Sequence, residues 1–175
     1  NKNIKKPNIL FISIDDLNDW TGYIGGHPQG KTPNIDKLAK KGIAFTNAYS
    51  SAPLCNPSRI SLLSGILPSN SGVYGNKEKF REKLPHAQTL MQYLKKNGYK
   101  TMGGGKIFHG YNNPGDSLSW DYYHKVQRNS GTRKTDGMFE ERYNGRDPKL
   151  PHRSIFRWGP IDIDDEEMAD VKVAY

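Results

Sequence analysis

The feature that most constrains the fold is an apolar run near the start of the chain, at residues 8–14. Its sequence is Asn-Ile-Leu-Phe-Ile-Ser-Ile, and its hydrophobicity is continuous rather than alternating. A strand with one buried face alternates apolar and polar residues, whereas a strand covered on both faces is apolar throughout. The run therefore predicts a strand of a parallel sheet that is covered by helices on both faces.

Two adjacent carboxylates, Asp15 and Asp16, follow this predicted strand directly. In open α/β sheets, ligands bind beyond the carboxyl ends of the strands. Neighbouring carboxylates repel each other unless a cation or several hydrogen-bond donors offset the repulsion, and their hard oxygen atoms suit calcium or magnesium. The pair therefore indicates a metal site, with the alternative that one of the aspartates only caps a turn or a helix.

Helices and strands alternate in the pattern that follows. Thr32 as the cap, proline as the first helical residue and Gly42 as the stop predict a helix over 33–41. Its lysines are expected to form a solvated face. A strand is expected over 43–49.

A second amphipathic helix is predicted over 89–97. It is expected to end at Gly98, and a third strand is expected over 99–102. Three side chains of this helix are expected to face inward: Leu90, Met91 and Leu94. Together these elements predict an α/β fold with a mostly parallel sheet flanked by helices.

The only cysteine lies in the stretch from Leu54 to Gly65. Proline two residues after Cys55 suits a helix start, and the glycine at the end of the stretch suits a helix stop. Cys55 and Arg59 are four residues apart and so lie on one helix face, near an end that favours anions. The stretch predicts a nucleophile at an anion site, on a helix with three apolar residues: Ile60, Leu62 and Leu63.

The strand expected at 99–102 leads into Gly-Gly-Gly-Lys-Ile-Phe-His-Gly. A phosphate-binding loop is excluded, because Lys100 stands where its first glycine is needed and Ile107 where a serine or threonine is needed. The segment is instead interpreted as a strand end at which the backbone can approach a ligand closely. Lys106 and His109 would lie near that ligand; the alternatives are a solvated lysine and a surface or hydrogen-bonded core histidine.

Composition narrows the class of protein only partly. The 175 residues suffice for one domain with a core, and the net charge of +8 suggests an anionic partner without identifying it. The basic residues are scattered and form no nucleic-acid-binding motif. No apolar run reaches membrane-spanning length, and a single cysteine excludes an internal disulfide and a multi-cysteine metal site.

The stretch over 111–160 lacks periodicity, which is typical of a long functional excursion or of a partly mobile segment. Its interleaved aromatic and basic residues could line a sugar or nucleic-acid site, or the aromatics could simply pack the loop down. The acidic residues over 164–167 are interpreted as the first turn of a helix that continues to Tyr175.

The motifs resemble the type I sulfatases of the alkaline phosphatase superfamily. The family signature is Cys-x-Pro-Ser-Arg followed by Leu-Thr-Gly, and Cys55 to Gly65 fits it with Ser64 in place of threonine. The apolar run with its Asp-Asp pair resembles the opening strand of the family. Thr32 to Ala39 is similar to its "TPNIDRLA" helix.

The segment from Gly98 to His109 resembles the iduronate-2-sulfatase-like branch, in which a "GK-[IV]-FH" segment follows a "NGY-x-T" strand. These matches occur in the same order as in the family and cover roughly the first two thirds of the chain. The resemblance implies an alkaline phosphatase-like fold that is incomplete in this chain. Residues 1–175 would be the N-terminal part of the catalytic domain, without the C-terminal subdomain.

The resemblance also implies a mechanism. Cys55 would be converted to formylglycine (3-oxoalanine), whose hydrate attacks the sulfur of a sulfate ester; its second hydroxyl then expels sulfate. Asp15, Asp16 and the oxygen at position 55 would hold Ca²⁺, with Mg²⁺ less favoured. Arg59 would steady the charges there, and two residues would contact the sulfate group or the ester oxygen: Lys106 and His109.

The implied function is hydrolysis of a sulfated saccharide, best a uronic-acid-containing polysaccharide or oligosaccharide. The alternatives are a phosphate or phosphonate monoester hydrolase of the same superfamily and a non-catalytic glycan-binding homologue. The remaining metal ligands are expected from a continuation of the chain or a second chain, so the 175 residues alone are predicted to be inactive. A periplasmic or extracellular location is expected, with the signal peptide outside this sequence and no membrane or nucleic-acid partner.

Overall fold

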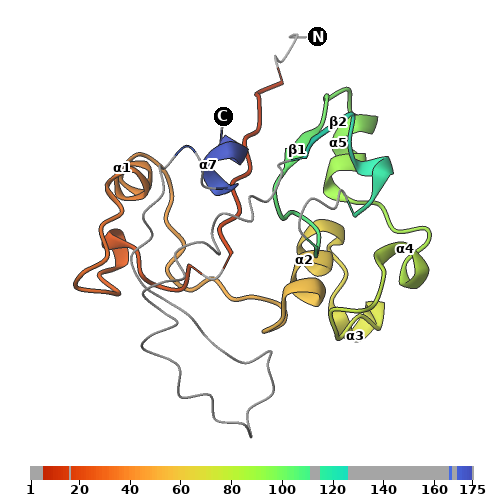
Figure 1. The fold of residues 1–175 in the computed structure, drawn as a ribbon, viewed down its shortest axis with the longest axis horizontal. Coiled ribbons are helices and arrows are strands. Elements are labelled where there is room, and N and C mark those ends of the chain that lie inside the picture. The colour runs from red at the N-terminus through yellow and green to blue at the C-terminus, as the bar shows by residue number, and fades with distance from the viewer. Residues whose placement is uncertain (1–5, 16, 111–114, 126–165, 167–168, 175) are drawn as a thin grey trace, which may run out of the picture. The chain divides into compact units, whose positions relative to one another are not determined.

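The computed structural model describes residues 6–15, 17–110, 115–125, 166 and 169–174 (Figure 1). The chain divides into two compact units, Asn1–Ser50 and Ser51–Tyr175, each of which is described by itself. Among the described helices, none combines the length and the apolar character needed to span a membrane.

The first unit contains two short helical elements, η1 (Gly22–Ile24) and α1 (Pro33–Lys41). Helix α1 has the predicted bounds, with Thr32 at its N-cap position. The Thr32 hydroxyl does not accept a bond from the helix; it accepts from the Gly22 amide (2.8 Å) and donates to Asp36 Oδ1 (2.8 Å). Asp36 Oδ1 also accepts from the Tyr23 amide (3.0 Å). Thr32 and Asp36 therefore tie η1 to α1.

The strands predicted at 8–14 and 43–49 are wrong for this structure, because both segments lack strand pairing in the described residues. Their apolar side chains are exposed, for example 85% for Leu10 and 75% for Phe45. A strand exists only where a second backbone supplies hydrogen-bond partners. The described part of this unit forms no such ladder, so an apolar sequence alone does not produce a strand here.

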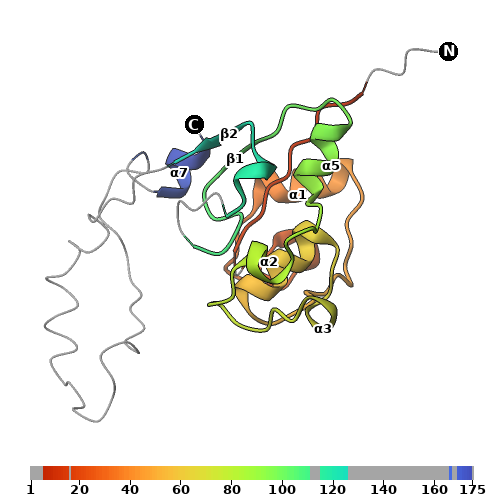
Figure 2. The same ribbon diagram turned by 90° about the vertical axis from the view of Figure 1, so that its right-hand side faces the viewer.

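The second unit has one small parallel sheet and several helices (Figure 2). Strands β1 (Met102–Gly104) and β2 (Tyr122–His124) pair in parallel, with Gly103 opposite Tyr123. The predicted α/β class with parallel pairing is thus present in partial form. The remaining elements are α2 (Cys55–Ser64), α3 (Pro68–Ser71), α4 (Phe80–Lys83), α5 (Leu90–Lys96), η2 (Ser117–Ser119) and α7 (Ala169–Ala174).

Helices α2 and α5 form where they were predicted, but each buries fewer apolar residues than expected. Gly65 ends α2 with φ +72°, and Gly98 follows α5 with φ +81°, a left-handed conformation that favours glycine. Leu62 and Leu90 are exposed rather than inward. Leu62 lies 200° around the helix from buried Ile60, so the two cannot share one face. The third predicted strand begins at Met102, later than expected.

The core of the second unit joins residues from five parts of the chain. Helix α2 packs against α3 and α5. The Phe108 ring, after β1, lies 5.7 Å from the Phe80 ring of α4, centroid to centroid. Because Phe108 is fully buried, it fixes the segment that carries Lys106 and His109. The core cluster comprises Ile60, Leu63, Val73, Phe80, Met91 and Phe108.

The excursion predicted over 111–160 lies mostly outside the described residues. Its described part, 115–125, contains η2 and β2. The helix predicted over 164–175 is described only as α7, and the remainder of that prediction, apart from residue 166, lies outside the described residues.

Candidate active site

Cys55 is the first residue of α2 and is partly buried. The next side chain, Asn56, holds this end of the helix to the loop at 75–78. Its amide nitrogen Nδ2 donates to the carbonyls of Gly75 (2.9 Å) and Glu78 (2.9 Å), while its backbone amide donates to Asn76 Oδ1 (3.0 Å). A ten-residue helix with an anchored first turn presents position 55 at the positive end of its dipole.

Arg59 lies one turn further along α2 and is buried, with 8% of its surface exposed. Its Nη1 donates to the backbone carbonyl of Lys106 and to that of Ile107, the latter at 3.1 Å. A buried guanidinium with carbonyl partners avoids much of the cost of an unpaired buried charge. Arg59 therefore links α2 to the segment after β1.

Lys106, in the segment after β1, contacts the first residue of α2. Its Nζ lies 3.8 Å from the Cys55 Sγ, so an ammonium group faces the side chain at position 55. Three of the residues singled out in the sequence, Cys55, Arg59 and Lys106, are thus brought together across about fifty residues of chain. A cation beside a helix N-terminus can bind an anionic group and stabilise negative charge that develops there.

His109 belongs to the same segment as Lys106. It follows the buried Phe108, is itself partly buried, and its Nδ1 is shielded from solvent. His109 is therefore partly shielded rather than on an open surface.

Protein side chains lie close to the glycine run at 103–105 on the side where each Cβ would be, and the predicted close approach of a ligand to this backbone stays a prediction. A Cβ at Gly103 would lie 2.6 Å from the Trp120 ring, and one at Gly104 would lie 3.4 Å from the His124 Cβ. Gly105 has φ +76°, and a Cβ there would lie 3.4 Å from Val173. Glycine is needed at Gly103 for space and at Gly105 for its backbone conformation.

The predicted metal ligands are only partly described. Asp15 lies in the Asn1–Ser50 unit and is exposed, whereas Asp16 lies outside the described residues. Within the described ranges, no three His, Cys, Asp or Glu side chains are grouped so as to hold a metal ion. The donor chemistry nevertheless fits Ca²⁺ if position 55 supplies an oxygen, since carboxylates are hard ligands and a thiolate is soft.

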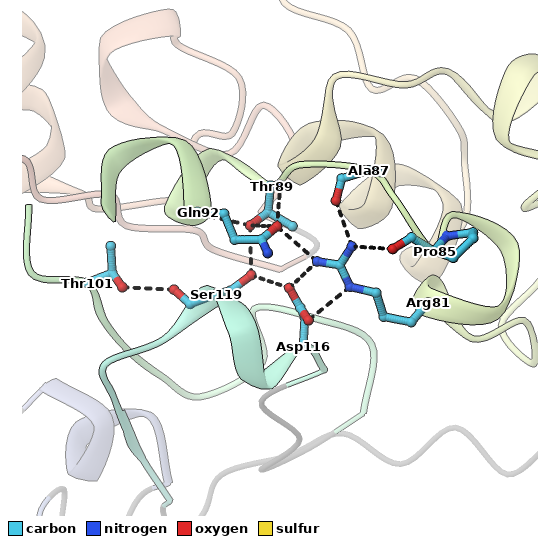
Figure 3. A network of polar contacts seen from close by, with 8 residues as sticks. All are labelled: Arg81, Pro85, Ala87, Thr89, Gln92, Thr101, Asp116 and Ser119. Atoms are coloured by element: carbon cyan, nitrogen blue, oxygen red, sulfur yellow. Dashed lines mark hydrogen bonds and ion pairs between the residues drawn. The ribbon is translucent and has the colours of Figure 1, made fainter. Parts of the chain in front are cut away.

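A polar network that joins α4, the start of α5 and η2 was not predicted from the sequence (Figure 3). Arg81 of α4 binds Asp116 in a bidentate fashion, at 3.0 Å from Nε and 2.6 Å from Nη2. Nη1 donates to the Ala87 carbonyl at 2.6 Å. Burial alone would raise the pKa of Asp116, but hydrogen bonds from Arg81 and Ser119 and the Arg81 charge outweigh it and lower that pKa.

The network continues from Asp116 to the start of α5. Ser119 Oγ donates to Asp116 Oδ2 (2.6 Å), so the Thr89 hydroxyl must donate to Ser119 Oγ (2.7 Å). Thr89 Oγ1 also accepts from the Gln92 backbone amide, and the Gln92 side chain accepts in return from the Thr89 backbone amide. These two bonds form a capping box at the start of α5. The Thr-x-x-Gln spacing could have revealed the box, whereas no sequence signal links Arg81 to a carboxylate 35 residues away.

Tyr123 of β2 is a second residue that sequence reasoning did not assign to the site. Its hydroxyl donates to the Gly105 carbonyl at 2.6 Å, and its ring lies 5.4 Å from that of Trp120. Burial raises the pKa of Tyr123, although a hydrogen bond with the Ile107 backbone and the Arg59 charge partly oppose this rise. The group therefore stays protonated, and can donate, at ordinary pH.

Comparison with known proteins gives one family match. The family model described as "Sulfatase" matches residues 7–173. A sulfatase of Formosa agariphila is 45% identical over 116 residues, which cover 63% of this chain and 23% of the relative. The iduronate 2-sulfatase of Mus musculus is 35% identical over 168 residues, covering 90% and 28%. The choline-sulfatase of Rhizobium meliloti is 29% identical, covering 87% and 34%. The chain thus spans about a quarter to a third of the length of these relatives.

Proposed function

The chain belongs to the sulfatase family, and we propose on that basis that the intact protein hydrolyses sulfate esters at position 55. The observation that carries the proposal is the pairing of Lys106 Nζ with the Cys55 Sγ at 3.8 Å, at the N-terminus of α2. The Lys106 ammonium can attract an anionic substrate, and the side chain at position 55 can supply the nucleophile. The alkaline phosphatase-like fold of the family accommodates such a site at the end of a parallel sheet.

The described residues would bind and orient the sulfate group. Lys106 places a positive charge beside position 55, and the N-terminus of α2 adds the positive end of the helix dipole. Arg59 keeps the Lys106 segment in place through the two carbonyls that it binds. His109, three residues after Lys106, would contact the sulfate group or the ester oxygen, where charge develops as the bond breaks.

We propose two further components of the site, a modified Cys55 and a calcium ion. A formylglycine at position 55 supplies an oxygen nucleophile and an oxygen ligand, which a thiol does not. Asp15, Asp16 and that oxygen would hold Ca²⁺, which supplies positive charge for the transition state. The relatives extend well beyond the part of their length that matches this chain. Further metal ligands would come from the corresponding part of the intact protein.

The proposed substrate is a sulfated saccharide that contains uronic acid. The similarity to the mouse and human iduronate 2-sulfatases supports this class, since the mouse protein matches 90% of the chain. The net charge of +8 is compatible with an acidic glycan. We also propose a periplasmic or extracellular location.

The test is a comparison of three substrates with the intact protein: an aryl sulfate, an aryl phosphonate and a sulfated uronic-acid disaccharide. We expect hydrolysis of both sulfate esters and slower or no hydrolysis of the phosphonate. Cys55→Ala is the matched inactive control, because it removes the side chain that becomes the nucleophile. Preference for the phosphonate would favour a phosphonate monoester hydrolase, and saccharide binding without turnover would favour a glycan-binding homologue.

A further inference from the structure

Three consecutive backbone carbonyls of the segment after β1 are each bound by a side chain from elsewhere in the unit. The Gly105 carbonyl accepts from the Tyr123 hydroxyl of β2 at 2.6 Å. The carbonyls of Lys106 and Ile107 accept from Arg59 of α2. The two donors therefore hold the backbone on both sides of the Lys106 side chain.

This arrangement matters because three consecutive glycines, at 103–105, lead up to Lys106, and glycine has unusual conformational freedom. Gly105 adopts φ +76°, directly before Lys106. A rotation there would swing the Lys106 side chain away from position 55, so the peptide unit after Gly105 needs an external tether. The Tyr123 hydroxyl supplies that tether at the carbonyl of this same peptide unit.

We propose that Tyr123 is a positioning residue that orients Lys106 toward position 55. The inference rests on the proposed function, because it assumes that the Lys106 ammonium acts on the sulfate group. Tyr123 acts through the backbone of Gly105 and does not itself contact the reacting atoms. Its neighbour Tyr122 is exposed (53%) on the same strand and offers a matched control.

The experiment compares Tyr123→Phe with Tyr122→Phe in the intact protein, each of which removes one hydroxyl. Steady-state kinetics with an aryl sulfate give kcat and KM, and hydrogen exchange of the peptide covering 103–110 reports the tether. For Tyr123→Phe we expect kcat to fall about five- to tenfold, as for the loss of one hydrogen bond. We expect an unchanged KM and faster exchange in 103–110, with exchange in α5 as in the wild type.

The result that supports the proposal is a fall in kcat and faster local exchange in Tyr123→Phe, with Tyr122→Phe unchanged. Equal kcat values in the two variants would overturn it, as would a loss of kcat accompanied by faster exchange throughout the unit, which indicates a general structural role. If the wild type hydrolyses no sulfate ester, the proposed function fails separately. The exchange data then decide alone: faster exchange at 103–110 in Tyr123→Phe supports the tether, and equal exchange refutes it.

Discussion

The Arg81–Asp116 pair gives the sharpest prediction about stability. Asp116 is 3% exposed, and its carboxylate accepts two bonds from Arg81 and one from Ser119. Asp116→Asn keeps the shape of the side chain but removes its charge and one acceptor position. Removal of one partner from a buried ion pair costs roughly 3–5 kcal/mol. Arg81 is 26% exposed and still donates to the Ala87 carbonyl in this variant. We therefore expect the free energy of unfolding to fall by about 2–3 kcal/mol.

The assay is urea denaturation of the intact protein, followed by tryptophan fluorescence. Glu82→Gln is the matched control. It neutralises a carboxylate that forms an ion pair with Lys79, and the side chains of Lys79 and Glu82 are 77% and 68% exposed. Exposed pairs of this kind contribute little to stability. A loss in Asp116→Asn no larger than that in Glu82→Gln would refute the account of the network.

The same pair predicts a pH dependence. The pKa of Asp116 in the folded protein lies below the unfolded value of 3.8, so the stability that this group contributes is fully present above that value. It is lost as pH falls through the folded pKa. The difference in free energy of unfolding between wild type and Asp116→Asn should therefore be constant near neutral pH and shrink in acid. A constant difference down to low pH would contradict the depressed pKa.

Three further changes test other parts of the structure. Gly105→Ala places alanine at φ +76° and should cost about 1–2 kcal/mol of stability; Gly65→Ala, at φ +72°, should cost a similar amount for the same reason, and an unchanged stability in either variant would contradict the conformational argument. Thr89→Val removes the capping box and the bond to Ser119 and should cost about 1–2 kcal/mol by urea denaturation; an unchanged midpoint would be the contrary result. Lys106→Ala should lower kcat toward an aryl sulfate by about 100- to 1000-fold, whereas Lys100→Ala, at an exposed lysine, should leave kcat unchanged. Equal kcat values for the two variants would show that Lys106 does not act in the site.

Local signals in the sequence predicted helices α1, α2 and α5, whereas the short helices α3 and α4 were not predicted. Proline and glycine punctuation located α1 and α2, and the spacing of Cys55 and Arg59 placed both on one short helix. These features depend on neighbours within a few residues, which a sequence displays directly.

Features that depend on distant partners were predicted poorly. The apolar run at 8–14 was interpreted as a strand, but a strand needs a second backbone beside it. The bonds from Arg59 to carbonyls nearly fifty residues away and from Tyr123 to Gly105 have no signature in the sequence. The contact of the Trp120 ring with the glycine run likewise depends on a residue that is distant in the sequence.

The proposed function depends most directly on the chemical state of Cys55. Mass spectrometry of the peptide that spans Cys55, from the intact protein, tests that state without any assumption about the substrate. We predict that the sulfur has been replaced by the aldehyde oxygen of formylglycine, and that a hydrazine reagent captures this aldehyde. An unmodified thiol in protein that hydrolyses sulfate esters would contradict the account.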